Sequence, residues 1–309
     1  MKMVNLQNEI ALYNTYCKKQ KKLSQHTIKA YKIDLTQFIA YKANMDISKD
    51  DLTEYIQHLH ETFKPKTVRR KIASLKAFIH YLYYQDIIDK NPFDKMDISF
   101  KEPLLLPRTI PEHLIRRIII SLYENIKTAT TSYERLTSIR NTAVIELLFA
   151  TGARISEICS LKSKDIDLNT RTIRILGKGS KERIIQIENH DVLSILNRYK
   201  ALFSDYIQHD GYFFLNNRKQ RLSEQSVRTV IRNLEKQINS DIHITPHMFR
   251  HSVATMLLEE DVDIRYIQKI LGHSSIITTQ IYTHVTSSKQ REIIRTKHPR
   301  NKIHMNTEV

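Results

Sequence analysis

The chain has 309 residues, and its 49 Lys and Arg residues outnumber 33 Asp and Glu, giving a formal net charge of +16. This length allows two ordinary domains with a core each. The basic excess favours a polyanionic partner such as nucleic acid or an anionic membrane, and a generally basic soluble protein is the alternative. With only Cys17 and Cys159 and no CxxC pair, a disulfide framework or a cysteine-rich zinc site is disfavoured. The N-terminus lacks a signal-peptide core and no stretch approaches about 18 uninterrupted apolar residues, so we expect a cytoplasmic protein without a membrane span.

Two amphipathic helices are predicted in the N-terminal third. In residues 24–43, SQHTIKAYKIDLTQFIAYKA, apolar side chains recur at helical intervals through Ile28, Tyr31, Leu35, Phe38 and Ile39. Residues 64–88 repeat the pattern, and basic residues crowd their first turns: Lys66, Arg69, Arg70 and Lys71. Because basic side chains at a helix N-terminus oppose its dipole, binding to phosphate would explain this cluster. A solvated helix face is the alternative.

A proline-rich segment separates the two halves of the chain. Between residues 91 and 113 the chain contains Pro92, Pro103, Pro107 and Pro111. These fixed φ angles and missing donors exclude a continuous helix. We therefore place an interdomain linker at residues 99–109, between an N-terminal helical domain (1–98) and a second domain (110–309).

The second domain is predicted to be mainly helical with one small β-hairpin. The segment RNTAVIELLFATGARISEICSLKSKDID indicates two helices separated by a turn at Thr151 and Gly152, the second beginning near Arg154. The β-branched stretches TRTIRIL and RIIQI predict two strands, joined by a Gly-containing turn in GKGSKE. The fold class is thus mainly α with a small β-hairpin or sheet.

The stretch ITPHMFRHSVATMLLEE places basic chemistry at the start of a helix. Thr245 can cap this helix with Pro246 at its first position, and the helix buries an apolar stripe of Phe249, Val253, Met256 and Leu257. His247 and Arg250 are surface neighbours in this pattern, suited to a phosphate oxyanion. A zinc-protease helix is the competing interpretation of His247 and His251. It lacks its general base, because Met248 replaces the required Glu, and no third ligand is evident.

Five further residues have ordinary interpretations when each is taken alone. Arg154 and Glu157, three apart on a helix, suit a surface ion pair, and Lys178 suits a solvated hairpin turn. In IQKILGHSSIITTQIYTHV, His273 precedes Tyr282 by nine residues, and a single His or Tyr is more often structural.

Taken together, the residues resemble the tyrosine recombinase (phage integrase) family. The family pattern is Arg, Lys, His-x-x-Arg, His and Tyr, matched in order by Arg154, Lys178, His247, Arg250, His273 and Tyr282. The flanking stretches ATGARISEICSLKSKDID, GKGSKER and LGHSSIITTQIYTHV are similar to family motifs as well. The N-terminal helices are similar to the SAM-like core-binding domain of Xer and mobile-element members. Three departures are Met256, where a His is frequent, the stretch EEDVD, which is more acidic than the usual Gly-containing turn, and the long Thr-rich KTATTSYERLTS.

The resemblance implies covalent catalysis without a metal or other cofactor. Tyr282 would attack a DNA phosphodiester, leaving a 3′-phosphotyrosyl bond and a free 5′-hydroxyl. Because a tyrosine with a pKa of about 10 is protonated at neutral pH, it needs a proton acceptor. His247 is the candidate for that acceptor, and Lys178 would protonate the leaving 5′-oxygen.

The resemblance also implies how the phosphate is held. Arg154 and Arg250 would clamp the non-bridging oxygens and stabilise charge in the transition state, with His273 donating another hydrogen bond. Glu157 would orient Arg154.

At the level of assembly, the resemblance implies a two-domain clamp on double-stranded DNA with an inverted-repeat core site. Four protomers would act on two sites through a Holliday junction, with or without a partner recombinase, at the nucleoid of a bacterial cytoplasm. The tail after Tyr282 would dock on the next protomer, and a frayed basic end is the alternative for its last ten residues. Two other functions stay open, a DNA-binding protein without cleavage and a nicking and resealing enzyme resembling type IB topoisomerases.

Overall fold

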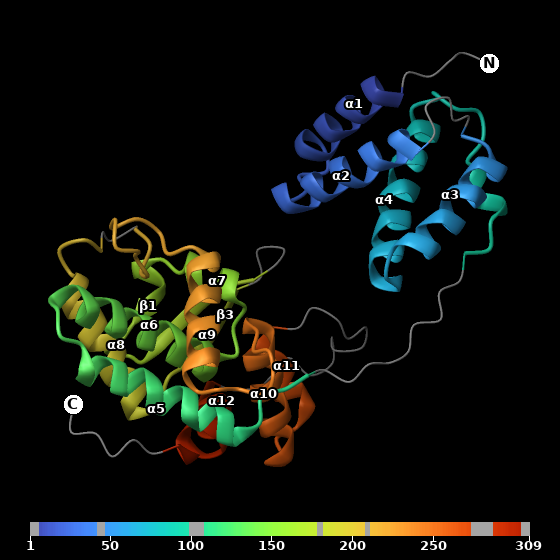
Figure 1. Ribbon diagram of the computed structural model, residues 1–309. Coiled ribbons are helices and arrows are strands. Elements are labelled where there is room, and N and C mark those ends of the chain that lie inside the picture. The colour runs from blue at the N-terminus through green and yellow to red at the C-terminus, as the bar shows by residue number, and fades with distance from the viewer. Residues whose placement is uncertain are drawn as a thin grey trace. The chain divides into compact units, whose positions relative to one another are not determined.

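The computed structural model describes residues 6–41, 47–98, 108–177, 182–207, 211–272 and 287–303. The chain divides into two compact units, residues 1–105 and 106–309 (Figure 1). The division falls inside the 99–109 segment predicted as the linker, of which residues 99–107 lie outside the described ranges. Within these ranges, no helix is both long enough and apolar enough to cross a lipid bilayer.

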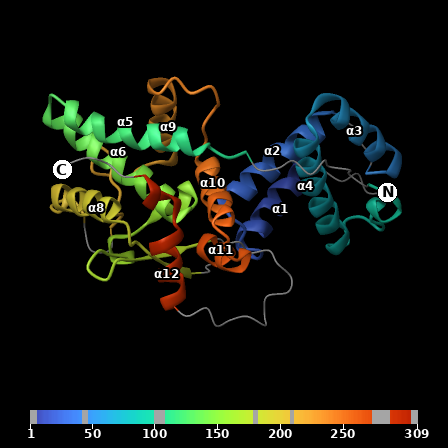
Figure 2. The ribbon, with the colours of Figure 1, turned by 90° about the horizontal axis from the view of Figure 1, so that it is seen from below.

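The described part of the N-terminal unit is entirely helical. Its elements are α1 (Leu6–Lys19), α2 (Gln25–Tyr41), α3 (Lys49–Thr62), α4 (Pro65–Tyr84) and the 3-10 helix η1 (Pro92–Lys95). Both predicted helices are confirmed, as α2 and α4, and Pro65 begins α4 where its missing N–H breaks no hydrogen bond. Helix α2 packs against α1 and α4 (Figure 2). Their shared core includes Leu35, Phe38 and Phe78, all essentially without exposure.

The described part of the C-terminal unit is built around one buried helix. In chain order its elements are α5 (Glu112–Thr128), α6 (Ser132–Thr151), α7 (Ile155–Ser160), η2 (Ser163–Asp165), β1 (Ile166–Asp167), β2 (Thr172–Leu176), β3 (Glu182–Gln186), α8 (His190–Phe203), α9 (Glu224–Gln237), α10 (Pro246–Glu259), α11 (Ile264–Leu271), α12 (Ser287–Lys297) and η4 (Pro299–Lys302). Residues 142–151 of α6 are all buried, because α5, α8 and α10 pack around this helix.

The Thr-rich segment that departs from the Xer pattern starts this central helix. The Thr131 hydroxyl accepts a hydrogen bond from the Glu134 backbone N–H at 3.1 Å, and the Glu134 carboxylate accepts one from the Thr131 N–H at 3.2 Å. This reciprocal capping satisfies N–H groups that would otherwise lack a partner at the helix end. The segment thus has a structural use in the C-terminal unit.

The predicted hairpin is confirmed as the antiparallel pair β2 and β3. The short strand β1, which the sequence pattern does not reveal, pairs with β2 and gives the order β1-β2-β3. Ile173 lies opposite Ile185 and Ile175 lies opposite Arg183, so these four side chains share one face of the sheet. The isoleucines of this face are buried. An arginine, Arg183, therefore belongs to the inward face of β3.

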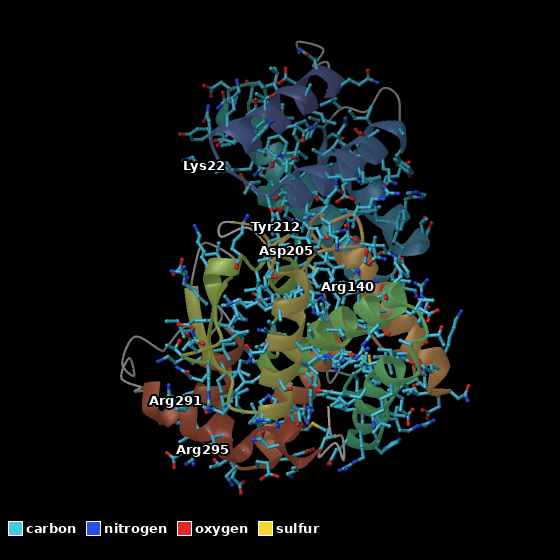
Figure 3. The ribbon with its side chains drawn as sticks, turned by 90° about the vertical axis from the view of Figure 1, so that its left-hand side faces the viewer. Lys22, Arg140, Asp205, Tyr212, Arg291 and Arg295 are labelled. Carbon is cyan, nitrogen blue, oxygen red and sulfur yellow. The ribbon has the colours of Figure 1, made fainter. Side chains whose placement is uncertain are left out.

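The tail packs against its own C-terminal unit. Helix α12 contacts β3, η4 contacts α10, and Ile293, Ile294 and Ile303 join the core of the unit. Arg291 and Arg295 of α12 are exposed (Figure 3). The frayed-end alternative is therefore wrong for residues 300–303, because their segment contributes buried side chains. Residues 304–309 lie outside the described ranges.

Candidate active site

A tight chain reversal places Arg154 and Glu157 at the start of α7. Gly152 ends α6 with a φ of +58°, and a Cβ at this position would lie 2.4 Å from Cδ2 of Leu271. Only glycine fits this conformation and this close approach. The predicted ion pair is present, with Arg154 Nη1 donating to Glu157 Oε1 at 2.8 Å. The Arg154 backbone N–H also donates to Glu157 Oε2 at 2.9 Å, which fixes the carboxylate at the helix start.

Helix α10 begins where predicted, with Thr245 at the N-cap position and Pro246 in its first turn, but the Thr245 side chain makes no capping hydrogen bond. Most of the predicted stripe is buried, whereas Met256 is only partly buried. His247 is exposed in the first turn. Burial, together with the nearby charges of His247 and Arg250, lowers the pKa of His251. His247 is thus the more exposed imidazole of this helix, and His251 is half-buried.

Arg250 lies deeper than the sequence pattern indicated. We expected a surface neighbour of His247, but Arg250 is only 3% exposed. Its Nη1 donates to the Gly152 carbonyl at 2.9 Å and its Nη2 donates to the Leu271 carbonyl at 2.6 Å. Both carbonyls lie at C-terminal ends of helices, where the helix dipole favours a cation. Burial lowers the pKa of Arg250 to about 10, with a further contribution from the Arg154 charge, so the guanidinium remains protonated at neutral pH.

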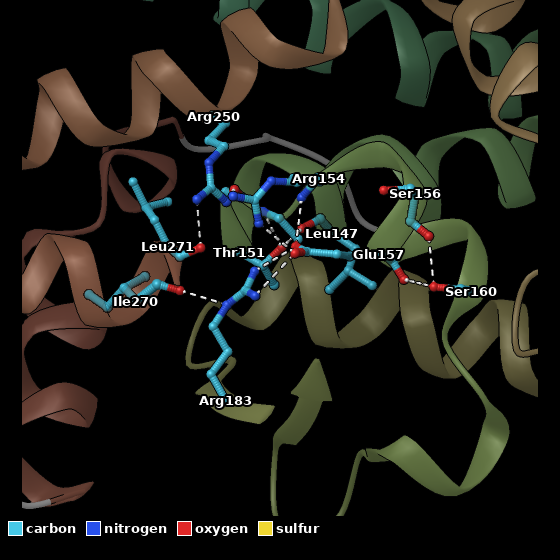
Figure 4. A network of polar contacts seen from close by, with 12 residues as sticks. Leu147, Thr151, Arg154, Ser156, Glu157, Ser160, Arg183, Arg250, Ile270 and Leu271 are labelled. Carbon is cyan, nitrogen blue, oxygen red and sulfur yellow. Dashed lines mark hydrogen bonds and ion pairs between the residues drawn. The ribbon is translucent and has the colours of Figure 1, made fainter. Parts of the chain in front are cut away.

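Arg183 is a member of the site that the sequence analysis did not identify. Figure 4 shows its guanidinium beside Glu157, together with those of Arg154 and Arg250. Arg183 Nη2 donates to Glu157 Oε2 at 2.7 Å, and Arg183 Nε donates to the Ile270 carbonyl at 3.0 Å. The box GKGSKER contains this residue, and the alternation of β3 could have placed it on the inward face.

Arg154, Glu157, Arg183 and Arg250 form a cationic network with a net positive charge. Burial acts to raise the pKa of Glu157, but hydrogen bonds from Arg183 and from the Arg154 backbone outweigh it, so the pKa is lowered and the carboxylate is charged. Three positive charges, the guanidiniums of Arg154, Arg183 and Arg250, lie near this one negative charge. The Arg154 side chain is 32% exposed, so this cationic cluster is accessible to an anion from solvent.

Three predicted catalytic residues, Lys178, His273 and Tyr282, lie outside the described residues. His273 follows Gly272 directly in the chain, and Gly272 is the C-cap of α11. A Cβ on Gly272 would lie 2.9 Å from Arg183 Nη1, so the backbone next to His273 belongs to the cationic network.

Only one residue of the basic cluster predicted to bind DNA through α4 is buried. Lys66, Arg69 and Arg70 are exposed, whereas Lys71 is not. Arg70 and Lys71 both pair with the buried Asp34, and the Lys71 Nζ lies 3.3 Å from Asp34 Oδ1. Lys71 is only 3% exposed, so its ammonium is directed into the N-terminal unit, contrary to the expected surface position. A buried carboxylate requires a cation nearby, and Lys71 supplies it.

Comparison with known proteins shows the family. Residues 119–289 match the model of the Phage integrase family, and residues 10–86 match the phage integrase N-terminal SAM-like domain. A tyrosine recombinase of Agathobacter rectalis is 51% identical over 305 residues, which cover 98% of this chain and all of that protein. Tyrosine recombinase XerD of Halalkalibacterium halodurans is 33% identical over 309 residues, covering 96% of this chain and 100% of that protein.

A solved structure shares the fold. The XerH site-specific recombinase bound to its difH substrate, in a pre-cleavage complex, has a TM-score of 0.67 and 23% identity, covering 94% of this chain and 89% of that chain. The predicted fold class, a SAM-like helical domain followed by a catalytic domain, is confirmed. The chain belongs to the phage integrase family of tyrosine recombinases, and it is a site-specific recombinase.

Proposed function

We propose that this recombinase cuts and rejoins double-stranded DNA with Tyr282 as its nucleophile, through a 3′-phosphotyrosyl intermediate. The observation that supports the proposal most strongly is the meeting of Arg154 and Arg250 in one cationic network, although they come from separate helices. A scissile phosphate is the anion that this pair would bind. Arg154 and Arg250 would hold its non-bridging oxygens, and loss of either should cost about 3–4 kcal/mol of transition-state stabilisation.

The remaining roles follow from the chemistry of the step. His247, exposed in the first turn of α10, would accept the proton of the Tyr282 hydroxyl. Lys178 would protonate the leaving 5′-oxygen, and His273 would add a hydrogen bond to the phosphate. The phosphotyrosyl bond keeps the energy of the broken phosphodiester. A 5′-hydroxyl from another duplex can therefore reverse the step and exchange strands without ATP.

The proposed substrate is duplex DNA with an inverted-repeat core site, in the bacterial cytoplasm at the nucleoid. Residues 1–98 and 110–309 would each supply half of a clamp, and the exposed Lys66, Arg69 and Arg70 would contact phosphates. A lambda integrase tetramer bound to a Holliday junction shares the fold, with a TM-score of 0.64 and 16% identity. We propose a homotetramer on two sites for this chain also.

A nicked suicide duplex tests the nucleophile. Cleavage of such a duplex releases a short strand, so the covalent protein–DNA adduct accumulates. We expect an adduct with the wild type and with Tyr133→Phe, which alters an exposed tyrosine on α6, but none with Tyr282→Phe. An adduct unchanged by Tyr282→Phe would show that another residue is the nucleophile. No adduct with the wild type would favour a DNA-binding protein, and relaxation of plasmids lacking the core site would favour a topoisomerase-like enzyme.

A further inference from the structure

Arg183 connects separate parts of the site through one side chain. It extends from β3, five positions after Lys178 in the chain, and its side chain is only 10% exposed. Its Nη2 and Nη1 donate to Glu157 Oε2 and Oε1 at 2.7 and 3.3 Å. Its Nε donates to the Ile270 carbonyl in α11 at 3.0 Å. All three nitrogens of the planar fork therefore have a partner, an arrangement that a lysine ammonium cannot reproduce.

The chain is shaped around this guanidinium at the end of α11. Gly272 has a φ of +67°, and a Cβ there would lie 2.9 Å from Nη1 and 3.2 Å from Cζ of Arg183. Glycine at this position lets the guanidinium pack against backbone directly before His273. Arg183 thus joins α7, β3 and the end of α11.

Glu157 accepts hydrogen bonds from two arginines, and this sharing determines how many Arg154 donors remain for an anion. Arg183 contacts both carboxylate oxygens, whereas the Arg154 guanidinium bonds Glu157 through Nη1 alone, at 2.8 Å. A guanidinium has five N–H donors, so most of the Arg154 fork is left to face an anion. Without Arg183, Arg154 would be drawn into a bidentate pair with the buried Glu157 and away from the phosphate.

We propose that Arg183 is a positioning residue for the recombination reaction, because it occupies Glu157 and so keeps Arg154 presented to the scissile phosphate. The proposal rests on the proposed function in one respect, the assignment of Arg154 as a phosphate clamp. Arg183 itself touches no substrate atom in this scheme. Its removal should therefore slow the covalent step while leaving DNA affinity nearly unchanged.

Single-turnover cleavage of the nicked suicide duplex at saturating protein separates these two effects. We expect Arg183→Gln to slow adduct formation roughly 100-fold, the cost of a misplacement of about 1 Å in a clamping group. Arg183→Lys keeps the charge and the aliphatic stem, and it should be slowed almost as much because it cannot bond both oxygens and the carbonyl. Arg174→Gln is the matched control. Arg174 lies on the adjacent strand and binds Asp165 through Nε and Nη2 at 3.1 and 3.0 Å, outside this network, so the rate should not change.

The Arg154→Ala background provides the decisive comparison. If Arg183 acts through Arg154, adding Arg183→Gln to Arg154→Ala should slow the reaction little further. Multiplicative losses in the double variant would overturn the proposal, as would a folded, DNA-bound Arg183→Lys protein that cleaves at the wild-type rate. Far-UV circular dichroism and DNA affinity identify variants that have merely lost their fold. A wild type that forms no adduct would instead contradict the proposed function.

Discussion

The buried pair of Arg300 and Glu146 attaches the tail to the central helix, and we predict that breaking it is costly. Arg300 Nε and Nη2 donate to the two Glu146 oxygens, each at 2.7 Å, and neither side chain is exposed. The Tyr123 hydroxyl donates to Glu146 Oε1 at 3.0 Å. The perturbation is Arg300→Met, which keeps an apolar side chain of comparable length and removes the charge.

The magnitude follows from the burial of the carboxylate that remains. Loss of one partner from a fully buried ion pair leaves an uncompensated charge and typically costs about 3–5 kcal/mol. If the tail detached, water would reach Glu146 and relieve the buried charge. The loss of unfolding free energy therefore cannot be much larger than the free energy with which the tail docks. Adding Glu146→Gln to Arg300→Met should restore most of the stability, because a neutral amide still accepts the hydrogen bond from Tyr123.

Urea denaturation of the full chain, followed by far-UV circular dichroism, gives the change in unfolding free energy from the midpoint. Limited proteolysis reports separately whether the tail has detached. The control is Arg228→Met, which breaks an ion pair with Glu224 that is 43% and 30% exposed on α9 and should cost less than about 0.5 kcal/mol. If Arg300→Met is as mild as this control, or if the double variant loses the sum of the two single losses, the buried charge is not what makes the substitution costly.

Three other outcomes are expected. Burial lowers the pKa of His298 from 6.5 to about 4, so the unfolded chain binds the extra proton between these values. Stability should thus be complete above pH 6.5 and fall by about 3 kcal/mol as pH approaches 4, and pH-dependent denaturation of His298→Asn should lack this component. In DNA binding, Lys66→Ala should reduce the steepness of the plot of log binding constant against log salt concentration by about 0.9. Lys71→Met should lower the stability of the fold and leave that slope unchanged. Equal slopes for Lys66→Ala and the wild type would show that Lys66 does not contact DNA. Gly152→Ala should lower the free energy of unfolding by more than about 1 kcal/mol, because it places a side chain at a positive φ and its Cβ would overlap the Leu271 side chain of α11. An unchanged midpoint of thermal unfolding would contradict this close approach.

Features set by neighbouring residues could be predicted from the sequence. The helical periodicity of α2 and α4, the strands of the hairpin and the start of α10 at Thr245 and Pro246 all follow from local patterns. The Arg154–Glu157 pair could be predicted too, because a separation of three residues on a helix brings two side chains together. The family resemblance rested on the order of residue types along the chain, which also requires no fold.

The depth of each charged group was decided only by the tertiary structure. Arginine and lysine usually lie on the surface, yet Arg250 and Lys71 are buried. Arg250 donates to backbone carbonyls at the ends of other helices, and Lys71 pairs with the carboxylate of Asp34 on α2. Arg183 joined the site for the same reason, through Glu157 and Ile270. A charged side chain can be buried only where hydrogen-bond partners or an opposite charge compensate it. These partners are distant in the chain, and Arg300 and Glu146 are 154 positions apart. Sequence spacing carries no information about such pairs, because packing brings them together.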